Sequence, residues 1–180
     1  MTLHLLLLGP PRLERNGQTL EPDTRKATAL LAYLAVTGRF HTRDTLAALL
    51  WPEMDDAHAR AALRRTLSSL KAAVGDLPLY VTRDSLGVNK DALWCDATEF
   101  EAAISAVAHH SHDAADLCAG CRERLAAAVA LYRDAFLSGF SLRDSAEFDD
   151  WQLATTEQLR RSLTTALAWL VRAHTAGNPT

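Results

Sequence analysis

The sequence predicts a mainly α-helical protein with a small antiparallel sheet, divided into a mixed N-terminal domain and an all-helical C-terminal domain. Two observations predict this class. Short apolar runs bounded by turn residues, which are typical of strands, occur only before about residue 96. After that point the chain is rich in alanine and leucine, with apolar residues recurring at helical spacing. We therefore expect one domain at 1–95 and a second at 96–180.

The composition is that of an ordinary globular protein, with 48% hydrophobic and 23% charged residues. The apolar run at residues 3–8 is too short to cross a bilayer and lacks the basic flank of a signal peptide, so we expect a cytoplasmic protein with no membrane partner. The net charge is −3, but residues 1–96 contain 12 Lys and Arg against 11 Asp and Glu, whereas residues 97–180 contain 7 against 11. Positive charge is therefore concentrated in the first half.

The first domain is expected to open with strands. Residues 3–8 are an apolar run of strand length, which ends at the Gly-Pro-Pro of residues 9–11. Residues 13–20 contain Asn16-Gly17, a dipeptide that favours a tight hairpin turn. These signals indicate a small antiparallel sheet.

Two helices are expected to follow the opening strands. Asp23 or Thr24 can cap the first, which ends at Gly38. The second begins at Thr42 and stops at Trp51, because a residue before proline disfavours helical geometry. The apolar positions of the two helices are Ala27, Leu30, Leu31, Leu34, Leu46, Leu49 and Leu50.

A third helix, expected over residues 55–75, has an unusual charge distribution. Asp55 or Asp56 can cap its start and Gly75 its end. Its apolar stripe is Ala59, Leu63, Leu67, Leu70 and Val74. Its charged residues between 57 and 74 are Arg60, Arg64, Arg65 and Lys71, with no acid to pair them. This bias is typical of a helix that faces phosphates, and a surface helix that is merely basic is the alternative.

The remaining pattern predicts a hairpin followed by helices. Residues 79–89 have strand-forming residues on both sides of Arg83-Asp84-Ser85. Three helical stripes then follow: Phe100, Ile104 and Val107; Leu117, Cys121, Leu125, Val129, Tyr132 and Phe136; and Phe148, Trp151, Leu159, Leu163, Ala166 and Leu170. Antiparallel helices of this kind are typical of TPR-like helical repeats, although the sequence contains no second copy of a repeat motif.

An opening sheet, three helices of which the last is basic, and a closing hairpin are the parts of a winged helix-turn-helix. The segments TRKATALLAYL, TRDTLAALLWP, ARAALRRTLSSLKAAVG and LYVTRDSLGVN resemble, in this order, the OmpR-type DNA-binding domain of SARP-type transcriptional activators. The continuation, DATEFEAAI, LAAAVALYRDAFLSGF and FDDWQLATTEQLRRSLTTALAWL, is similar to the bacterial transcriptional activator domain of the same family. The resemblance covers essentially the whole chain. Because that helical domain is usually longer, the resemblance implies that residues 96–180 are a truncated copy.

The resemblance implies a recognition helix at 57–74 and a wing at 79–89, which together bind double-stranded DNA. By position, the implied contact residues are Arg60, Arg64, Arg65, Ser68, Ser69, Lys71 and Arg83. Arginine can donate two hydrogen bonds to guanine, so Arg64 or Arg65 would read sequence while Lys71 positions the backbone. On a helical wheel Arg65, Ser68 and Ser69 point away from the apolar stripe, and Arg64 and Lys71 flank it.

The predicted function is a transcriptional activator that binds promoter repeats and recruits RNA polymerase, and a homodimer on DNA is one arrangement open to it. The resemblance suggests that the loop at 51–56 faces the polymerase, whereas Trp51 itself is expected to be a core or loop anchor. The alternative is a helical protein-interaction adaptor that does not bind DNA. The sequence contains no phosphate loop, nucleophile elbow or zinc-protease motif, so we expect neither an enzyme nor a small-molecule substrate.

Histidines and cysteines cluster between residues 109 and 121. Cys-x-x-Cys lets two thiolates bind one ion, and two nearby imidazoles complete a tetrahedral set. The predicted ligands of a structural zinc ion are His110, His112, Cys118 and Cys121. His109 can replace His110, and Cys95 is a more distant candidate. A plain core role for Cys121 and a redox Cys-x-x-Cys are the other interpretations, the latter without the thioredoxin-like setting it needs.

Overall fold

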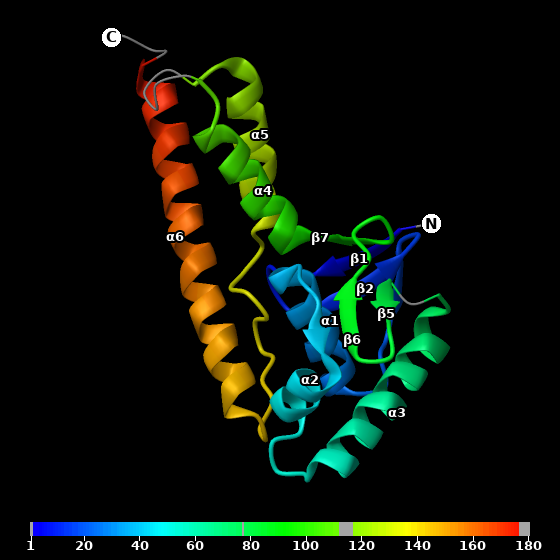
Figure 1. Cartoon of the computed structure of the whole chain (residues 1–180). Helices are drawn as coiled ribbons and strands as arrows, with labels where there is room; N and C mark the ends of the chain where they lie inside the picture. Colours follow the sequence, from blue (N-terminus) through cyan, green and yellow to red (C-terminus); the bar gives the residue numbers. More distant parts are fainter. Residues whose placement is uncertain (1, 77, 112–116, 177–180) are drawn as a thin grey trace.

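The structure is a computed structural model that describes residues 2–76, 78–111 and 117–176 (Figure 1). Its strands are β1 (Leu3–Leu6), β2 (Arg12–Arg15), β3 (Gln18–Leu20), β4 (His41–Thr42), β5 (Leu79–Val81), β6 (Ser85–Val88) and β7 (Leu93–Cys95). Its helices are α1 (Arg25–Thr37), α2 (Arg43–Leu50), α3 (Asp56–Val74), α4 (Asp96–Ala108), α5 (Ala119–Leu131) and α6 (Ala146–Ala176). The predicted class, mainly helical with a small sheet, is confirmed. No helix in the described part of the chain has the length and apolar character needed to span a membrane.

Two small sheets lie in the N-terminal half. The first has the order β3-β2-β1-β7, and its first three strands are antiparallel as expected. β7 pairs in parallel with β1, Leu5 lying opposite Cys95, so this sheet is mixed and not purely antiparallel. Three residues are too few to give a strand pattern, which is why the sequence did not predict β7. The second sheet, β4-β6-β5, contains the hairpin expected at residues 79–89.

The starts of the first three helices agree with the capping signals in the sequence. The hydroxyl of Thr24 accepts a hydrogen bond from the Ala27 N–H, which makes Thr24, and not Asp23, the cap of α1. Thr42 caps α2 and Asp55 caps α3 in the same way. All seven apolar positions expected in the first two helices are buried. α1 also ends as expected, because Gly38 adopts the left-handed conformation there.

The second C-terminal helix is shorter than the apolar stripe predicted. The stripe extends to Phe136, but α5 ends at Leu131, and the segment after it pairs with the N-terminal strand region. The Leu137 N–H donates to the Leu7 carbonyl at 2.8 Å, and Phe136 is buried beside Leu8. Residues beyond the end of β1 thus have their backbone groups satisfied by tertiary contacts, and this pairing overrides the helical periodicity.

A buried carboxylate joins the two halves of the chain. Asp96, at the start of α4, accepts hydrogen bonds from the N–H groups of Leu7 at 2.6 Å and Leu8 at 3.1 Å. The Arg133 guanidinium lies 3.1 Å from the same carboxylate, whose side chain is 1% exposed. Farther along, the Ser145 hydroxyl donates to the Leu49 carbonyl at 2.6 Å. These bonds fix the helical half against the first half, and the domain boundary at 95/96 stays a prediction.

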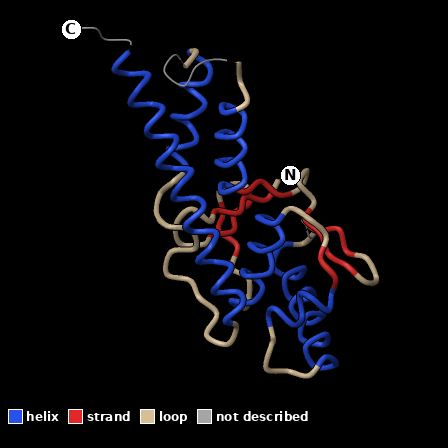
Figure 2. The backbone as a smooth tube through the Cα atoms, turned by 60° about the vertical axis from the view of Figure 1, so that its left-hand side comes forward, coloured by secondary structure: helices blue, strands red, loops and turns tan. Residues whose placement is uncertain are grey.

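Helix α6 runs the length of the molecule, beside α2 at one end and beside α4 and α5 at the other (Figure 2). Aromatic packing holds its first turns, with Trp151 against both Tyr33 of α1 and Phe136. As a result α3 and the β5–β6 hairpin lie on the side of the molecule away from α6 (Figures 1 and 2).

Candidate nucleic-acid interface

Helix α3 and the β5–β6 hairpin border an open groove. The apolar stripe of α3 is buried against the core, so its basic side chains face outward. α3 itself packs against α2. The groove is lined by Thr42, Arg43, Asp44, Ala57, Arg60, Leu63, Arg64, Leu67, Ser68, Lys71, Asp76, Val81, Arg83 and Asp84. Four of the seven DNA contacts implied by the resemblance lie on α3 along this groove, and a fifth, Arg83, lies in the hairpin turn.

We call the groove-facing residues Arg60, Arg64, Ser68 and Lys71 the hairpin side of α3. They follow one another at helical spacing of three and four residues, which places them in one row. Arg43 and Arg83 bring two more cations from α2 and the hairpin, against the three acids Asp44, Asp76 and Asp84. Charge from three separate elements therefore converges on one groove.

Two of these arginines are engaged within the protein. Arg60 forms a two-pronged ion pair with Asp44, with N···O distances of 2.6 and 2.8 Å. Arg43 donates from two nitrogens to the Thr82 carbonyl, at 3.2 and 3.0 Å, and so ties α2 to the hairpin. Arg43 and Asp44 were not among the residues predicted from the sequence. Their position directly after the Thr42 cap, at the start of a helix beside the basic one, was the available signal.

The other three cations of the groove, Arg64, Lys71 and Arg83, are exposed and form no ion pair with any residue that the structure describes. Ser68 lies between Arg64 and Lys71 on the helix and is exposed as well. Unpaired cations gain the most when they meet phosphate, because no internal ion pair has to be broken first.

The opposite side of α3's exposed face, which we call the Trp51 side, consists of Arg65 and Ser69. These residues line a second, smaller pocket together with Asp23, Trp51 and Met54. The Ser69 hydroxyl donates to the Asp23 carboxylate, and Ser69 is half-buried. Ser69 lies off the apolar stripe, as the helical wheel indicated, but it does not face open solvent, because the segment before α1 packs against this side of the helix. Arg65 remains exposed.

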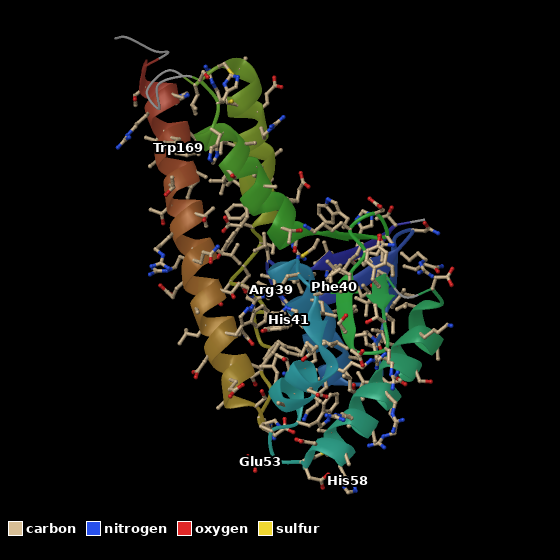
Figure 3. The ribbon with its side chains drawn as sticks, viewed as in Figure 1. Arg39, Phe40, His41, Glu53, His58 and Trp169 are labelled. Atoms are coloured by element: carbon tan, nitrogen blue, oxygen red, sulfur yellow. The ribbon has the colours of Figure 1, made fainter. Side chains whose placement is uncertain are left out.

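The turn between α2 and α3 has a buried anchor and an exposed rim. Trp51 is 7% exposed, and the Lys26 ammonium lies 5.1 Å from its ring centroid, which confirms the anchor role expected for Trp51. Met54 is 46% exposed. Figure 3 shows Glu53 of this turn and His58, in the first turn of α3, at the end of the molecule remote from Trp169. The turn therefore offers an accessible surface next to the start of α3.

Three of the four predicted zinc ligands lie together. His110, Cys118 and Cys121 form a cluster between α4 and α5, and His112 lies outside the described residues. The backbone N–H of Cys121, and then its thiol, hold the pKa of Cys118 below its ordinary value. Desolvation, followed by the neighbouring Cys118, raises the pKa of Cys121. Cys95 is buried in β7, and desolvation raises its pKa to about 11, so it is a core residue.

Known proteins that are similar to this chain include the following two. The chain is 29% identical over 158 residues to the regulatory protein AfsR of Streptomyces coelicolor. This alignment covers 84% of this chain and 16% of AfsR. Its fold matches the structure of Mycobacterium tuberculosis EmbR in complex with a low-affinity phosphopeptide, with a TM-score of 0.68 and 27% identity over 90% of this chain and 44% of that chain. No protein-family model matches. The chain thus spans less than half the length of either relative.

Proposed function

We propose that this chain, which belongs to the SARP-type transcriptional activators, binds promoter DNA by placing α3 in the major groove with the β5–β6 hairpin as its wing. Its relatives are regulators of transcription, and a regulatory role for the chain follows from them. The observation that carries the proposal of DNA binding is the cationic set Arg64, Lys71 and Arg83, which a helix and a hairpin bring to one groove and which forms no ion pair within the described part of the chain.

The positions of the residues on α3 suggest which of them would contact bases and which would contact phosphates. A helix in the major groove turns the middle of its exposed face to the bases, and its flanks to the two phosphate backbones. Ser68 stands in the middle, with Arg64 and Arg65 on either flank of it. Either arginine can donate two bonds to a guanine, whereas Lys71, nearer the end of the helix, is suited to a phosphate. Arg83 in the wing would meet the backbone or the minor groove next to it.

Arg60 and Ser69 are assigned smaller roles than the resemblance implies. Arg60 would have to exchange Asp44 for a phosphate, and the carboxylate left behind would repel DNA. Ser69 already donates its hydroxyl proton to Asp23. We infer that Arg60 and Ser69 mainly hold α3 against its neighbours.

Recruitment of RNA polymerase is assigned to the turn between α2 and α3. The buried side chain of Trp51 anchors this turn, and Met54 is exposed at its surface. A rigid loop with an exposed apolar side chain suits contact with another protein, because little ordering is needed on binding. Residues 51–56 also adjoin the start of α3, so a polymerase contact there would be made close to the bound DNA.

A salt titration tests the proposal of DNA binding. The probe is a duplex selected by the protein from a random pool, and binding is followed by fluorescence anisotropy at increasing salt. Each phosphate contact contributes about 0.9 to the slope of log K against log salt, so the parent should show a steep slope. The double variant Arg64→Ala/Lys71→Ala should bind more weakly and with a smaller slope. Arg161→Ala, an exposed arginine of α6, is the matched control and should bind like the parent.

The result that would overturn the proposal is equal binding by the double variant and the parent. An absence of any salt-dependent duplex binding by the folded parent would instead favour the adaptor function. In that case the exposed apolar residues Leu153, Leu167 and Val171 of α6 would be the first surface to test for a protein partner.

A further inference from the structure

The His/Cys cluster lies where α4 ends and α5 begins, at the end of the molecule opposite α3 (Figure 1). The His110 Nδ1 atom is 3.5 Å from the Cys121 sulfur and 3.9 Å from the Cys118 sulfur. All three ligand atoms lie within 4.8 Å of one another. One small ion could therefore be bound by all three.

These separations match tetrahedral zinc. With Zn–S bonds of about 2.3 Å and Zn–N bonds of about 2.0–2.1 Å, a tetrahedral angle puts sulfur and nitrogen ligands about 3.6 Å apart. The two measured S···N distances of 3.5 and 3.9 Å lie on either side of that value. Two thiolates and an imidazole are a donor set that zinc favours over calcium or magnesium, which prefer oxygen ligands.

Local backbone structure explains how the three side chains meet. Cys118 is the residue that precedes α5, and Cys121 is at the third position of that helix, one turn farther on. A spacing of three residues at a helix start puts both sulfurs on the same side. The partial positive charge of the helix N-terminus also favours thiolates there.

The structure decides between the two candidate histidines. The His109 Nδ1 atom lies 2.7 Å from the Ser105 carbonyl, so this ring donates to the last turn of α4. The His110 ring, one residue later, faces the two sulfurs. His110 is therefore the histidine that lies with both sulfurs, and His109 is not part of this cluster.

We propose that His110, Cys118 and Cys121 bind one zinc ion, which ties the end of α4 to the start of α5. These three residues would fill three of the four positions of the tetrahedron. The ion has a structural role, because it links two packed helices far from the groove beside α3. It would hold together the connection between α4 and α5, whose ends the cluster already joins.

Metal analysis of the whole chain, purified reduced and without a polyhistidine tag, tests this proposal. We expect about one zinc ion per chain. After removal of zinc, titration with Co²⁺ alone should give the sulfur-to-cobalt charge-transfer absorption that reports thiolate ligands. Cys118→Ser and His110→Ala should each weaken Zn²⁺ binding by at least about tenfold. Cys118 and His110 are both exposed, so these two variants should keep the fold, which circular dichroism checks.

Matched controls separate ligation from general disturbance. His109→Ala removes the neighbouring imidazole and Cys95→Ser a thiol outside the cluster, and both should retain the metal and the cobalt absorption. Zinc far below one equivalent with no cobalt–thiolate absorption would overturn the proposal and leave a sulfur–imidazole hydrogen bond. A Cys118–Cys121 disulfide that survives reduction, seen by mass spectrometry, would overturn it too. Loss of metal in the His109→Ala variant, with metal retained in the His110→Ala variant, would show that His110 is wrongly assigned.

Discussion

The two sides of α3 carry similar side chains but have different surroundings. On the hairpin side, Arg64 and Lys71 line a groove that is also lined by Arg43 of α2 and Arg83 of the hairpin. On the Trp51 side, Arg65 and Ser69 adjoin Asp23 and an aromatic anchor. The difference teaches that the net charge of a helix is a poor guide to its binding surface. What matters is which cations remain unpaired after the neighbouring elements have packed, and whether those elements add charge of the same sign.

The largest expected effect is that of removing Arg64. Arg64→Ala should cost on the order of 1–3 kcal/mol of specific duplex binding if the contact is bidentate to a base. Arg65→Ala is the matched change on the other side of the helix and should cost less, because no cations from the hairpin reinforce that side. Anisotropy titrations at one salt concentration measure both. A greater loss for Arg65→Ala than for Arg64→Ala would reverse our ranking of the two sides.

The wing should contribute affinity without sequence preference. Arg83→Ala is expected to weaken binding to all duplexes about equally and to lower the salt slope by about 1, as for a lost phosphate contact. The measurement compares the selected duplex with single-base-pair variants of it at several salt concentrations. If Arg83→Ala relaxed the preference at one base pair only, the arginine would have to be reading a base.

A gain in binding is expected on removing Asp44. Asp44→Ala frees Arg60 from its ion pair and removes a negative charge from the groove, so duplex binding should tighten. Both partners are more than half exposed, so the gain should be less than about 1 kcal/mol. The double variant Asp44→Ala/Arg60→Ala should lose most of it. Unchanged or weaker binding by a folded Asp44→Ala variant would mean that Arg60 and Asp44 act as a unit on DNA.

The smallest effect on DNA is expected at Ser69. Ser69→Ala removes the hydrogen bond to Asp23, so it should lower the free energy of unfolding by about 0.5–1.5 kcal/mol while leaving duplex binding unchanged. Urea denaturation measures the first quantity and anisotropy the second. Ser68→Ala, one residue earlier and exposed, should show the opposite pattern. A clear loss of DNA affinity in Ser69→Ala would restore Ser69 to the interface.

Much of the fold could be predicted from the sequence because its signals are local. The caps at Thr42 and Asp55, the αL glycine at Gly38 and the apolar stripe of α3 each depend on residues within a turn or two of one another. The end of α5 could not be predicted in this way. Its last turns are decided by backbone bonds to Leu7 and Leu8, more than a hundred residues away in the chain. The same is true of β7, which is a strand because β1 is there to pair with it.

For the candidate interface too, features that depend on neighbouring residues could be predicted from the sequence, whereas contacts between distant residues could not. The row of basic residues on α3 was visible in the sequence, because helical spacing alone determines it. The Arg60–Asp44 pair and the Ser69–Asp23 bond were not, since each joins residues 16 or 46 positions apart. In the zinc candidate, the Cys-x-x-Cys spacing was a local signal, whereas the choice of His110 over His109 required the distances from the histidine ring to the two sulfurs.

The contacts of the buried Asp96 carboxylate affect the direction in which α6 would point when the protein is bound to promoter DNA. Asp96 joins the helical half to the residues after β1, so we expect the 31-residue α6, about 46 Å long, to keep a fixed direction relative to α3. On bound DNA its far end would point in a direction set by the helical phase of the site. Moving that site by about 5 base pairs, half a turn, would carry the far end of α6 to the other face of the duplex. The spacing between neighbouring sites would then set the relative rotation of the bound proteins about the DNA axis as well as the distance between them.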